Sequence, residues 1–289
     1  MNVAYFPGCS QHGLAKENDI SSRVVCQHLG INLQEIEDWN CCGATAAHSL
    51  NHLLAIGLSA RNLSQVRDMG LKNVTTPCAG CFNRLKTASY EMKNNQIIAE
   101  KVQKIIGRPA PHEPEVKSLL QLISEEIGEG VKQKVVKPLN GLKLAAYYGC
   151  LLTRPKKISA FDDPDQPVSM DNLMQAIGAE TISWGYKTEC CGGGYAASQT
   201  SIVYDLGGQV LASALEGGAQ AVVVACPMCQ ANLDTRQEAI CKSKGETRRL
   251  PIIYFTQLMG IAFGYSPAEL GMKRLLNSPY PLLKRKNLI

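Results

Sequence analysis

The sequence has no long apolar run. No stretch of its 289 residues approaches the roughly 18 consecutive apolar residues that a membrane-spanning helix needs. The first residues, MNVAYFPGCSQHG, also lack the basic start, apolar stretch and cleavage site of a secretory signal. We therefore expect a cytoplasmic protein with no direct insertion into a membrane.

Two ligand-binding patterns are missing as well. No arginine-rich stripe with interleaved aromatic residues accompanies the mild net charge of +5, so we expect no nucleic-acid partner. The three glycines from Gly192 to Gly194 follow a cysteine pair and do not form the Gly-x-Gly-x-x-Gly fingerprint of nicotinamide and flavin sites. The sequence therefore predicts neither of these cofactors.

Cysteine is the residue in excess, with 12 in the chain. Thiols stay reduced in the cytosol, so a disulfide scaffold is not expected. Cysteine-rich intracellular proteins more often bind metal or carry out redox chemistry. The excess therefore indicates one of these two roles.

Ten of the cysteines form two sets of five with nearly equal spacing. Each set is a single cysteine, an adjacent pair and a Cys-x-x-Cys motif. The first set is Cys9, Cys41, Cys42, Cys78 and Cys81, and the second is Cys150, Cys190, Cys191, Cys226 and Cys229. The flanks repeat too: VTTPCAGCFNRL from Val74 resembles VVVACPMCQANL from Val222. This pattern predicts a duplicated domain, with Cys26 and Cys241 outside it as packing residues.

The same order of strands and helices is expected in both halves. Apolar or alternating segments predict strands at 2–6, 31–36, 71–76, 142–148, 181–184 and 221–225. Amphipathic segments that end at glycine predict helices at 15–29, 50–70, 169–177 and 196–216, and a further helix from about Phe82. We expect an α/β fold of two pseudo-repeated, Rossmann-like domains with parallel sheets. The expected boundaries are 1–90 for the N-terminal domain, 91–140 for a connecting segment with a helix near 115–127, and 141–289 for the C-terminal domain.

Each cysteine element follows a predicted strand. In parallel α/β sheets, ligands bind beyond the carboxyl ends of the strands, so three strand ends would bring five thiols to one place. The Cys-x-x-Cys motifs fall at predicted helix starts, where free N–H groups stabilise thiolates. The sequence therefore predicts one thiol-rich site in each half.

Several occupants fit such a site. Structural zinc needs four ligands, which leaves one thiol over. A thioredoxin-like dithiol leaves the adjacent pair unexplained, and inert buried cysteines leave the spacing unexplained. An iron–sulfur cluster suits an all-thiolate site best, although an ordinary cubane takes four cysteines. We therefore favour iron–sulfur and keep zinc as the alternative in one or both sites.

The doubled pattern resembles the CCG cysteine-rich domain family, and most closely the family of the heterodisulfide reductase B subunit. The resemblance implies that each domain holds a non-cubane [4Fe-4S] cluster ligated by all five of its cysteines. It also implies that a disulfide is cleaved between the two clusters. Implied partners are the small ferredoxin-like C subunit of heterodisulfide reductase, which supplies electrons, and the flavin-containing A subunit. The chain departs from many relatives at Leu151, where they carry histidine.

Some further residues are candidates for substrate contact or proton transfer. Arg154, Lys156, Lys157 and Lys187 are close in sequence to ligands of the second set and could bind an anionic substrate. His12 and His48 follow first-set cysteines and could donate protons, since histidine titrates near neutral pH.

Three functions follow from the resemblance. The first is an iron–sulfur oxidoreductase: the disulfide-cleaving subunit of a heterodisulfide reductase complex, which would act on the CoB–CoM disulfide. The second has the same chemistry on a disulfide of a sulfur-carrier protein. The third is an electron-relay or docking subunit of a succinate dehydrogenase-like complex.

Overall fold

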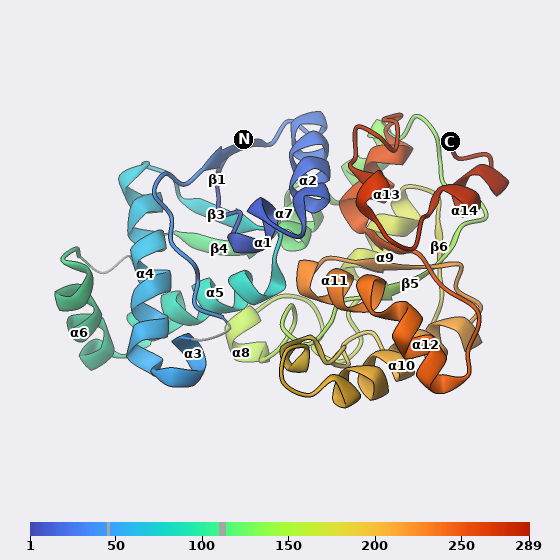
Figure 1. Ribbon diagram of the computed structural model, residues 1–289. Helices are drawn as coiled ribbons and strands as arrows, with labels where there is room; N and C mark the ends of the chain where they lie inside the picture. Colours follow the sequence, from blue (N-terminus) through green and yellow to red (C-terminus); the bar gives the residue numbers. More distant parts are fainter. Residues whose placement is uncertain (45–46, 110–113) are drawn as a thin grey trace.

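The chain folds into two halves that lie side by side, blue to green and yellow to red in Figure 1. The computed structural model describes residues 1–44, 47–109 and 114–289. Each half contains a four-stranded parallel sheet, and the strand order β2-β1-β3-β4 of the first recurs as β6-β5-β7-β8 in the second. The prediction of two repeated α/β domains with parallel sheets is confirmed.

The described elements of the two halves follow one another in matching order. In the N-terminal half they are β1 (Asn2–Tyr5), α1 (Cys9–His12), α2 (Lys16–His28), β2 (Asn32–Glu35), α3 (Ala47–Leu50), α4 (His52–Asp68), β3 (Asn73–Thr76), α5 (Ala79–Asn94), α6 (Gln96–Ile106), β4 (Glu115–Ser118), α7 (Leu119–Glu126) and η1 (Gly128–Lys134). In the C-terminal half they are β5 (Lys143–Tyr147), α8 (Lys156–Ser159), α9 (Ser169–Ala176), β6 (Glu180–Thr181), η2 (Gly193–Tyr195), α10 (Thr200–Glu216), β7 (Ala221–Val224), α11 (Pro227–Thr235), α12 (Gln237–Lys244), β8 (Ile252–Tyr254), α13 (Phe255–Ala262), η3 (Met272–Arg274) and α14 (Tyr280–Arg285).

The inner strands form the core of each sheet. Every residue of β7 is buried, as expected for a small, β-branched strand covered on both faces. Tyr5 and Tyr147 end the equivalent strands β1 and β5 and are both buried. Their hydroxyls donate to Asp19 Oδ1 at 2.7 Å and to the Glu189 carbonyl at 2.6 Å. These bonds satisfy polar groups that would otherwise be costly to bury.

The structure corrects several predicted elements. The segment expected as a helix near 115–127 begins with a strand, β4, which pairs with β3, and only then continues as α7. Part of the segment 91–140 therefore belongs to the first sheet, while the domain boundaries stay predictions. The helix expected from about Phe82 begins at Ala79, and the strand expected at 181–184 is the two-residue β6.

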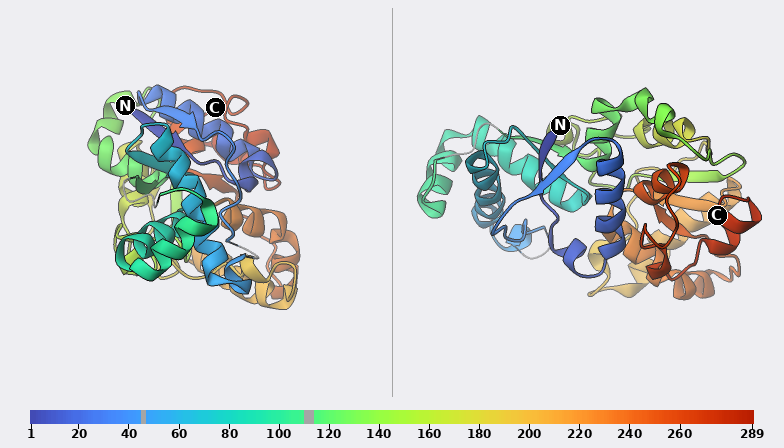
Figure 2. Two further views of the ribbon diagram at one scale, coloured as in Figure 1. Left: turned by 90° about the vertical axis from the view of Figure 1, so that its left-hand side faces the viewer. Right: turned by 90° about the horizontal axis from the view of Figure 1, so that it is seen from above.

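The two halves pack through equivalent helices. Helix α13 of the second half lies against α2 of the first, and α7 of the first lies against α9 of the second (Figures 1 and 2). At the α2–α13 contact, Ser21 Oγ and Thr256 Oγ1 are 2.7 Å apart and His28 stacks on Phe263 with ring centroids 4.6 Å apart. This reciprocal contact fixes the two sheets relative to each other.

Candidate metal centre

The carboxyl ends of the strands bring each set of cysteines together. Cys9 begins α1 after β1, the adjacent pair follows β2, and Cys78 caps the N-terminus of α5 after β3. The second set repeats this after β5, β6 and β7, with Cys226 as the N-cap of α11. The cysteines therefore lie at the strand ends, as predicted from the sequence, and their role as metal ligands stays a prediction.

The sulfur contacts are nearly the same in the two sets. Cys42 Sγ is 3.3 Å from Cys81 Sγ, and Cys191 Sγ is 3.8 Å from Cys229 Sγ. The backbone N–H two residues after the first member of each pair donates to its sulfur, at 3.4 Å from Gly43 and 3.3 Å from Gly192. The repeat seen in the sequence is thus a repeat of local geometry.

A glycine before the first cysteine gives the sulfurs room in each half. Gly8 has φ +72°, and a Cβ there would lie 2.8 Å from Cys81 Sγ. Gly149 has φ +69°, and a Cβ there would lie 2.9 Å from Cys229 Sγ. Any other residue would be strained and would push against a thiol, so this close approach requires glycine.

Each adjacent pair contains a thiol that ionises more readily than an ordinary cysteine. The Cys81 thiol lowers the pKa of Cys42 to about 7, and the Cys150 thiol lowers that of Cys190 to about 6. Thiolates are the form that binds metal. By contrast, burial raises the pKa of Cys26, which lies outside both sets, to about 12, in keeping with an inert packing role.

The two sets meet at their Cys-x-x-Cys motifs. Cys78 and Cys226 interact directly, which raises the pKa of Cys78, while the Cys229 and Cys78 thiols lower that of Cys226. Met228 Sδ lies 3.7 Å from the position of a Cβ on Gly80, so the two motif loops also touch. The ten thiols therefore lie on either side of one boundary between the halves.

A cavity of about 460 Å³ opens at this boundary. All five cysteines of the second set line it, and the first half contributes residues from its own cysteine loops. The other lining residues are Ala44, His48, Ser49, Ala79, Gly80, Tyr148, Leu151, Gly193, Gly194, Tyr195 and Met228. The wall is largely apolar, and Leu151 forms part of it.

The four predicted substrate cations do not line this cavity. Arg154 contacts Asp165 Oδ1 at 2.6 Å and Thr188 Oγ1 at 2.9 Å, and Lys187 is buried against Asp171 Oδ2 at 2.9 Å. Lys156 and Lys157 are exposed on α8, where Lys157 Nζ lies over the Tyr90 ring. These side chains have other partners or point to solvent, so their proposed contact with a substrate gains no support.

The two candidate histidines differ in position. His12 Nε2 is 3.3 Å from Glu35 Oε1 and its ring packs on Trp39, outside the cavity lining. His48 lines the cavity, with Nδ1 3.4 Å from Ser49 Oγ. Only His48 is placed to exchange a proton with a molecule in the cavity, and its role stays a prediction.

One cation near the first set was not predicted from the sequence. Arg84 follows Cys81 by one helical turn, and its half-buried guanidinium lies close enough to Cys42 to help lower the pKa of that thiol. Its hydrogen-bond partner among the described residues is Asn83 Oδ1, at 2.5 Å. The second set has Asn232 at the equivalent position, which donates to the Cys191 carbonyl at 2.7 Å. The two sites therefore differ in charge.

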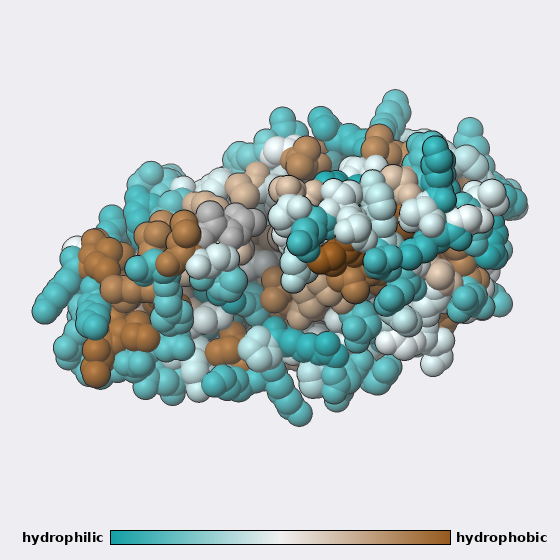
Figure 3. All heavy atoms as spheres, turned by 60° about the horizontal axis from the view of Figure 1, so that its bottom comes forward, coloured by the Kyte–Doolittle hydropathy of each residue, from teal (hydrophilic) through white to brown (hydrophobic). Residues whose placement is uncertain are grey.

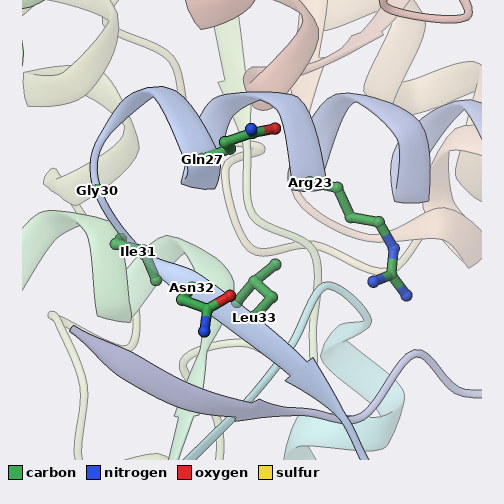
Figure 4. Close-up of a pocket in the computed structure, with 6 residues that line it drawn as sticks. All are labelled: Arg23, Gln27, Gly30, Ile31, Asn32 and Leu33. Carbon is green, nitrogen blue, oxygen red and sulfur yellow. The ribbon is translucent and has the colours of Figure 1, made fainter.

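A second hollow lies away from the cysteines. Figure 4 shows this cavity of about 370 Å³, formed by the end of α2, the following turn and β2, with Arg23 at one side. The Arg23 guanidinium is paired with Asp19, at 2.9 Å, and with Glu35. With no cysteine in its lining and its cation already paired, it is not the candidate redox site.

The cysteine sets fit a group larger than one ion. Among the residues that the structure describes, no three histidine, cysteine or acidic side chains converge closely enough to hold a single metal ion. Each set nevertheless offers five thiols from three strand ends, with a glycine leaving space beside the sulfur. An iron–sulfur cluster, which is held by thiolates and spreads them around several irons, suits this donor set.

Fold and site together define a protein with two repeated cysteine-rich α/β domains. The family model described as "CCG: Cysteine-rich domain" matches residues 3–86 and 144–234. The chain belongs to this family, as predicted from its cysteine spacing.

Several named proteins are similar along the chain. The 8-methylmenaquinol:fumarate reductase membrane anchor subunit of Wolinella succinogenes is 34% identical over 93% of this chain and 94% of its own. The B subunit of a ferredoxin/F420H2-dependent CoB–CoM heterodisulfide reductase of Methanosarcina acetivorans is 28% identical over 94% of this chain and 92% of its own.

The fold also occurs in a solved structure. A hypothetical protein from Helicobacter pylori superimposes with a TM-score of 0.73 at 11% identity, over 96% of this chain and 52% of that one. The chain thus spans about half of that protein, and the likeness shows the fold alone. Together with the family match, the relatives named as heterodisulfide reductase subunits indicate an iron–sulfur oxidoreductase subunit.

Proposed function

We propose that the chain is an electron-transfer subunit of a fumarate reductase-like complex, and that a small apolar electron donor binds beside its second set of cysteines. The observation that carries this proposal is the cavity, whose lining joins the five second-set thiols, which would hold a cluster, to small and apolar side chains that would contact the donor. The name of the most identical of the relatives reported above, which matches almost the full chain, suggests a methylmenaquinol as the donor. A quinol ring suits an apolar wall.

Each set of five cysteines would hold one non-cubane [4Fe-4S] cluster, as the resemblance implies. When bound, such a cluster supplies one-electron transfer. Oxidation of the quinol releases two electrons and two protons and leaves the quinone. His48 lines the cavity and would accept one of the two protons, the second would pass to solvent, and Leu151 and Met228 would pack against the donor. The electrons would leave through a partner subunit.

Disulfide reduction is the second candidate. Here a disulfide, two electrons and two protons give two thiols, and electrons enter from the ferredoxin-like C subunit and the flavin-containing A subunit. The five thiols on one open cavity and the relatives named as the B subunit of heterodisulfide reductase favour this reaction. The same chemistry on a disulfide of a sulfur-carrier protein belongs to this candidate.

Metal analysis tests the cofactor. Anaerobically purified protein should contain about eight iron atoms with acid-labile sulfide, the sum of two four-iron clusters. Two zinc atoms without sulfide would replace both proposals by a structural zinc protein.

Turnover with two substrates tests the reaction. We expect the intact complex to oxidise a short-tailed menaquinol and to leave the CoB–CoM disulfide unreduced. Leu151→Asp should slow quinol oxidation about tenfold, because a charge in the apolar wall is costly, while Leu276→Asp on the exposed surface serves as the control. Reduction of the disulfide with no quinol oxidation would establish the second candidate instead.

A further inference from the structure

Large apolar side chains are exposed together at the end of the N-terminal half. Leu50 and Leu54, in α3 and α4, are 80% and 47% exposed, and Ile97 and Ile105, in α6, are 66% and 60% exposed. We call these four residues the α4–α6 patch. Figure 3 shows apolar side chains gathered at this end of the molecule, at the left.

The patch is one surface because its helices touch. Helix α6 packs along α4, and the Ile105 side chain lies 4.0 Å from the position of a Cβ on Gly57. Leu54, in the first turn of α4, precedes Gly57 by three residues, so the two lie on the same side of that helix, and Leu50 ends α3, which packs against α4. Figure 2, left, shows α6 beside α4 with α3 below them.

Basic side chains are interleaved with the patch. Lys101 and Lys104 lie between Ile97 and Ile105 on the exposed side of α6, and Lys93 is exposed at the end of α5. None of these three lysines has a carboxylate partner among residues 1–44, 47–109 and 114–289. Glu100, exposed on the same helix, accepts a hydrogen bond from Gln96 Nε2 at 3.0 Å, so the surface combines apolar side chains with a net positive charge.

We propose that the α4–α6 patch docks on an anionic lipid bilayer. Helices that lie in a membrane interface combine an apolar stripe with lysines that attract acidic headgroups. The centres of protein–protein interfaces are instead depleted in lysine, so a lipid surface fits the charge of the patch better than a partner protein. No helix in the described part of the chain is long and apolar enough to cross a membrane, and this docking needs none.

The docking surface adjoins the cavity. His48 and Ser49, the residues directly before Leu50, line the cavity beside the second set of cysteines. A protein docked through the patch would therefore hold the mouth of the cavity near the lipid. The purpose of this docking rests on the proposed function: a quinol dissolved in the bilayer could then enter the cavity.

Vesicle flotation of the full chain, without any substrate, tests the docking. We expect binding to vesicles of phosphatidylcholine with phosphatidylglycerol that weakens as salt is raised, and little binding to phosphatidylcholine alone. Ile97→Ser with Ile105→Ser should weaken binding about tenfold, because two exposed isoleucines that docking would bury in the lipid are lost. Lys101→Glu with Lys104→Glu should abolish the preference for the anionic lipid.

Val136→Ser with Leu276→Ser is the matched control, since these side chains are 74% and 69% exposed elsewhere and should leave binding unchanged. Equal loss in the control and the patch variants, or no binding by the unaltered chain, would overturn the proposal. If the patch variants lost a partner protein and the chain bound no lipid, the proposal would also be overturned, and the patch would be assigned to that partner. Because flotation needs no turnover, its outcome is independent of the reaction at the cysteines.

Discussion

At the scale of single residues, two features decide what the thiol sites can hold. The glycine before the first cysteine of each set leaves space beside a sulfur, and Arg84 gives the first site a positive neighbour where the second has the neutral Asn232. The spacing in the sequence predicted which cysteines lie together, whereas the closeness of Arg84 to Cys42 is seen only in the folded structure. The sequence instead indicates four cations near the second set, and their role stays a prediction, since closeness along the chain does not place them in the cavity lining.

The glycine before Cys9 can be tested directly. Gly8→Ala should cost the first site its metal, because the added Cβ meets Cys81 Sγ at 2.8 Å, and iron content should fall by about half. Gly30→Ala is the control: Gly30 also has positive φ, at +76°, but nothing lies within 4 Å of its Cβ position. Backbone strain should lower the free energy of unfolding of both variants by about 1 kcal/mol, which thermal unfolding measures. Full iron content in Gly8→Ala would contradict the role of this close approach.

Arg84 should set the reduction potential of the first site above that of the second. A nearby positive charge stabilises the reduced, more negative state, so Arg84→Gln should lower the potential of the first site. An electron paramagnetic resonance titration measures it. Arg108→Gln is the control, since Arg108 is half-exposed and paired with Asp68 at 2.6 Å. An unchanged potential in Arg84→Gln would exclude this electrostatic role.

At the scale of elements, the fold was predictable where the pattern was strong. The buried runs at 221–225 and 142–148 are strands, and the strand ends do carry the cysteines. β4 was missed because its four residues, EVKS, run directly into the amphipathic helix α7 and show too few alternations to stand out. β8 is also short, and it was missed because it lies after the last cysteine motif, where the repeat no longer indicates the positions of strands.

Among the described helices of eight or more residues, α6 is the most open to local unfolding, because it has the fewest buried residues, Ala99 and Val102. Its N-cap Asn95 accepts a hydrogen bond from the Ile98 N–H at 3.2 Å. Asn95→Ala should cost about 1 kcal/mol, which speeds hydrogen exchange in α6 about fivefold and leaves exchange in α4 unchanged. Ser118→Ala, at the N-cap of the buried α7, should instead lower global stability in a denaturant titration. Uniformly faster exchange across the half would mean that α6 unfolds with its domain.

At the scale of the whole molecule, a duplicated fold has acquired unequal sites. The halves repeat strand order, sulfur contacts and glycine cradles, yet the cavity is lined by all five cysteines of the second set and by no cysteine of the first. The substrate should therefore meet the second site, and the first should exchange electrons with it across the contact between Cys78 and Cys226.

Spectra of two matched variants can separate these roles. In the unaltered protein, substrate should perturb the paramagnetic signal of the second site, since that site forms the cavity wall. Cys41→Ser damages the first site, so it should stop turnover and preserve this perturbation. Cys190→Ser damages the second site, so it should stop turnover and remove the perturbation. If Cys41→Ser removed the perturbation while Cys190→Ser kept it, the substrate would bind at the first site and not at the second.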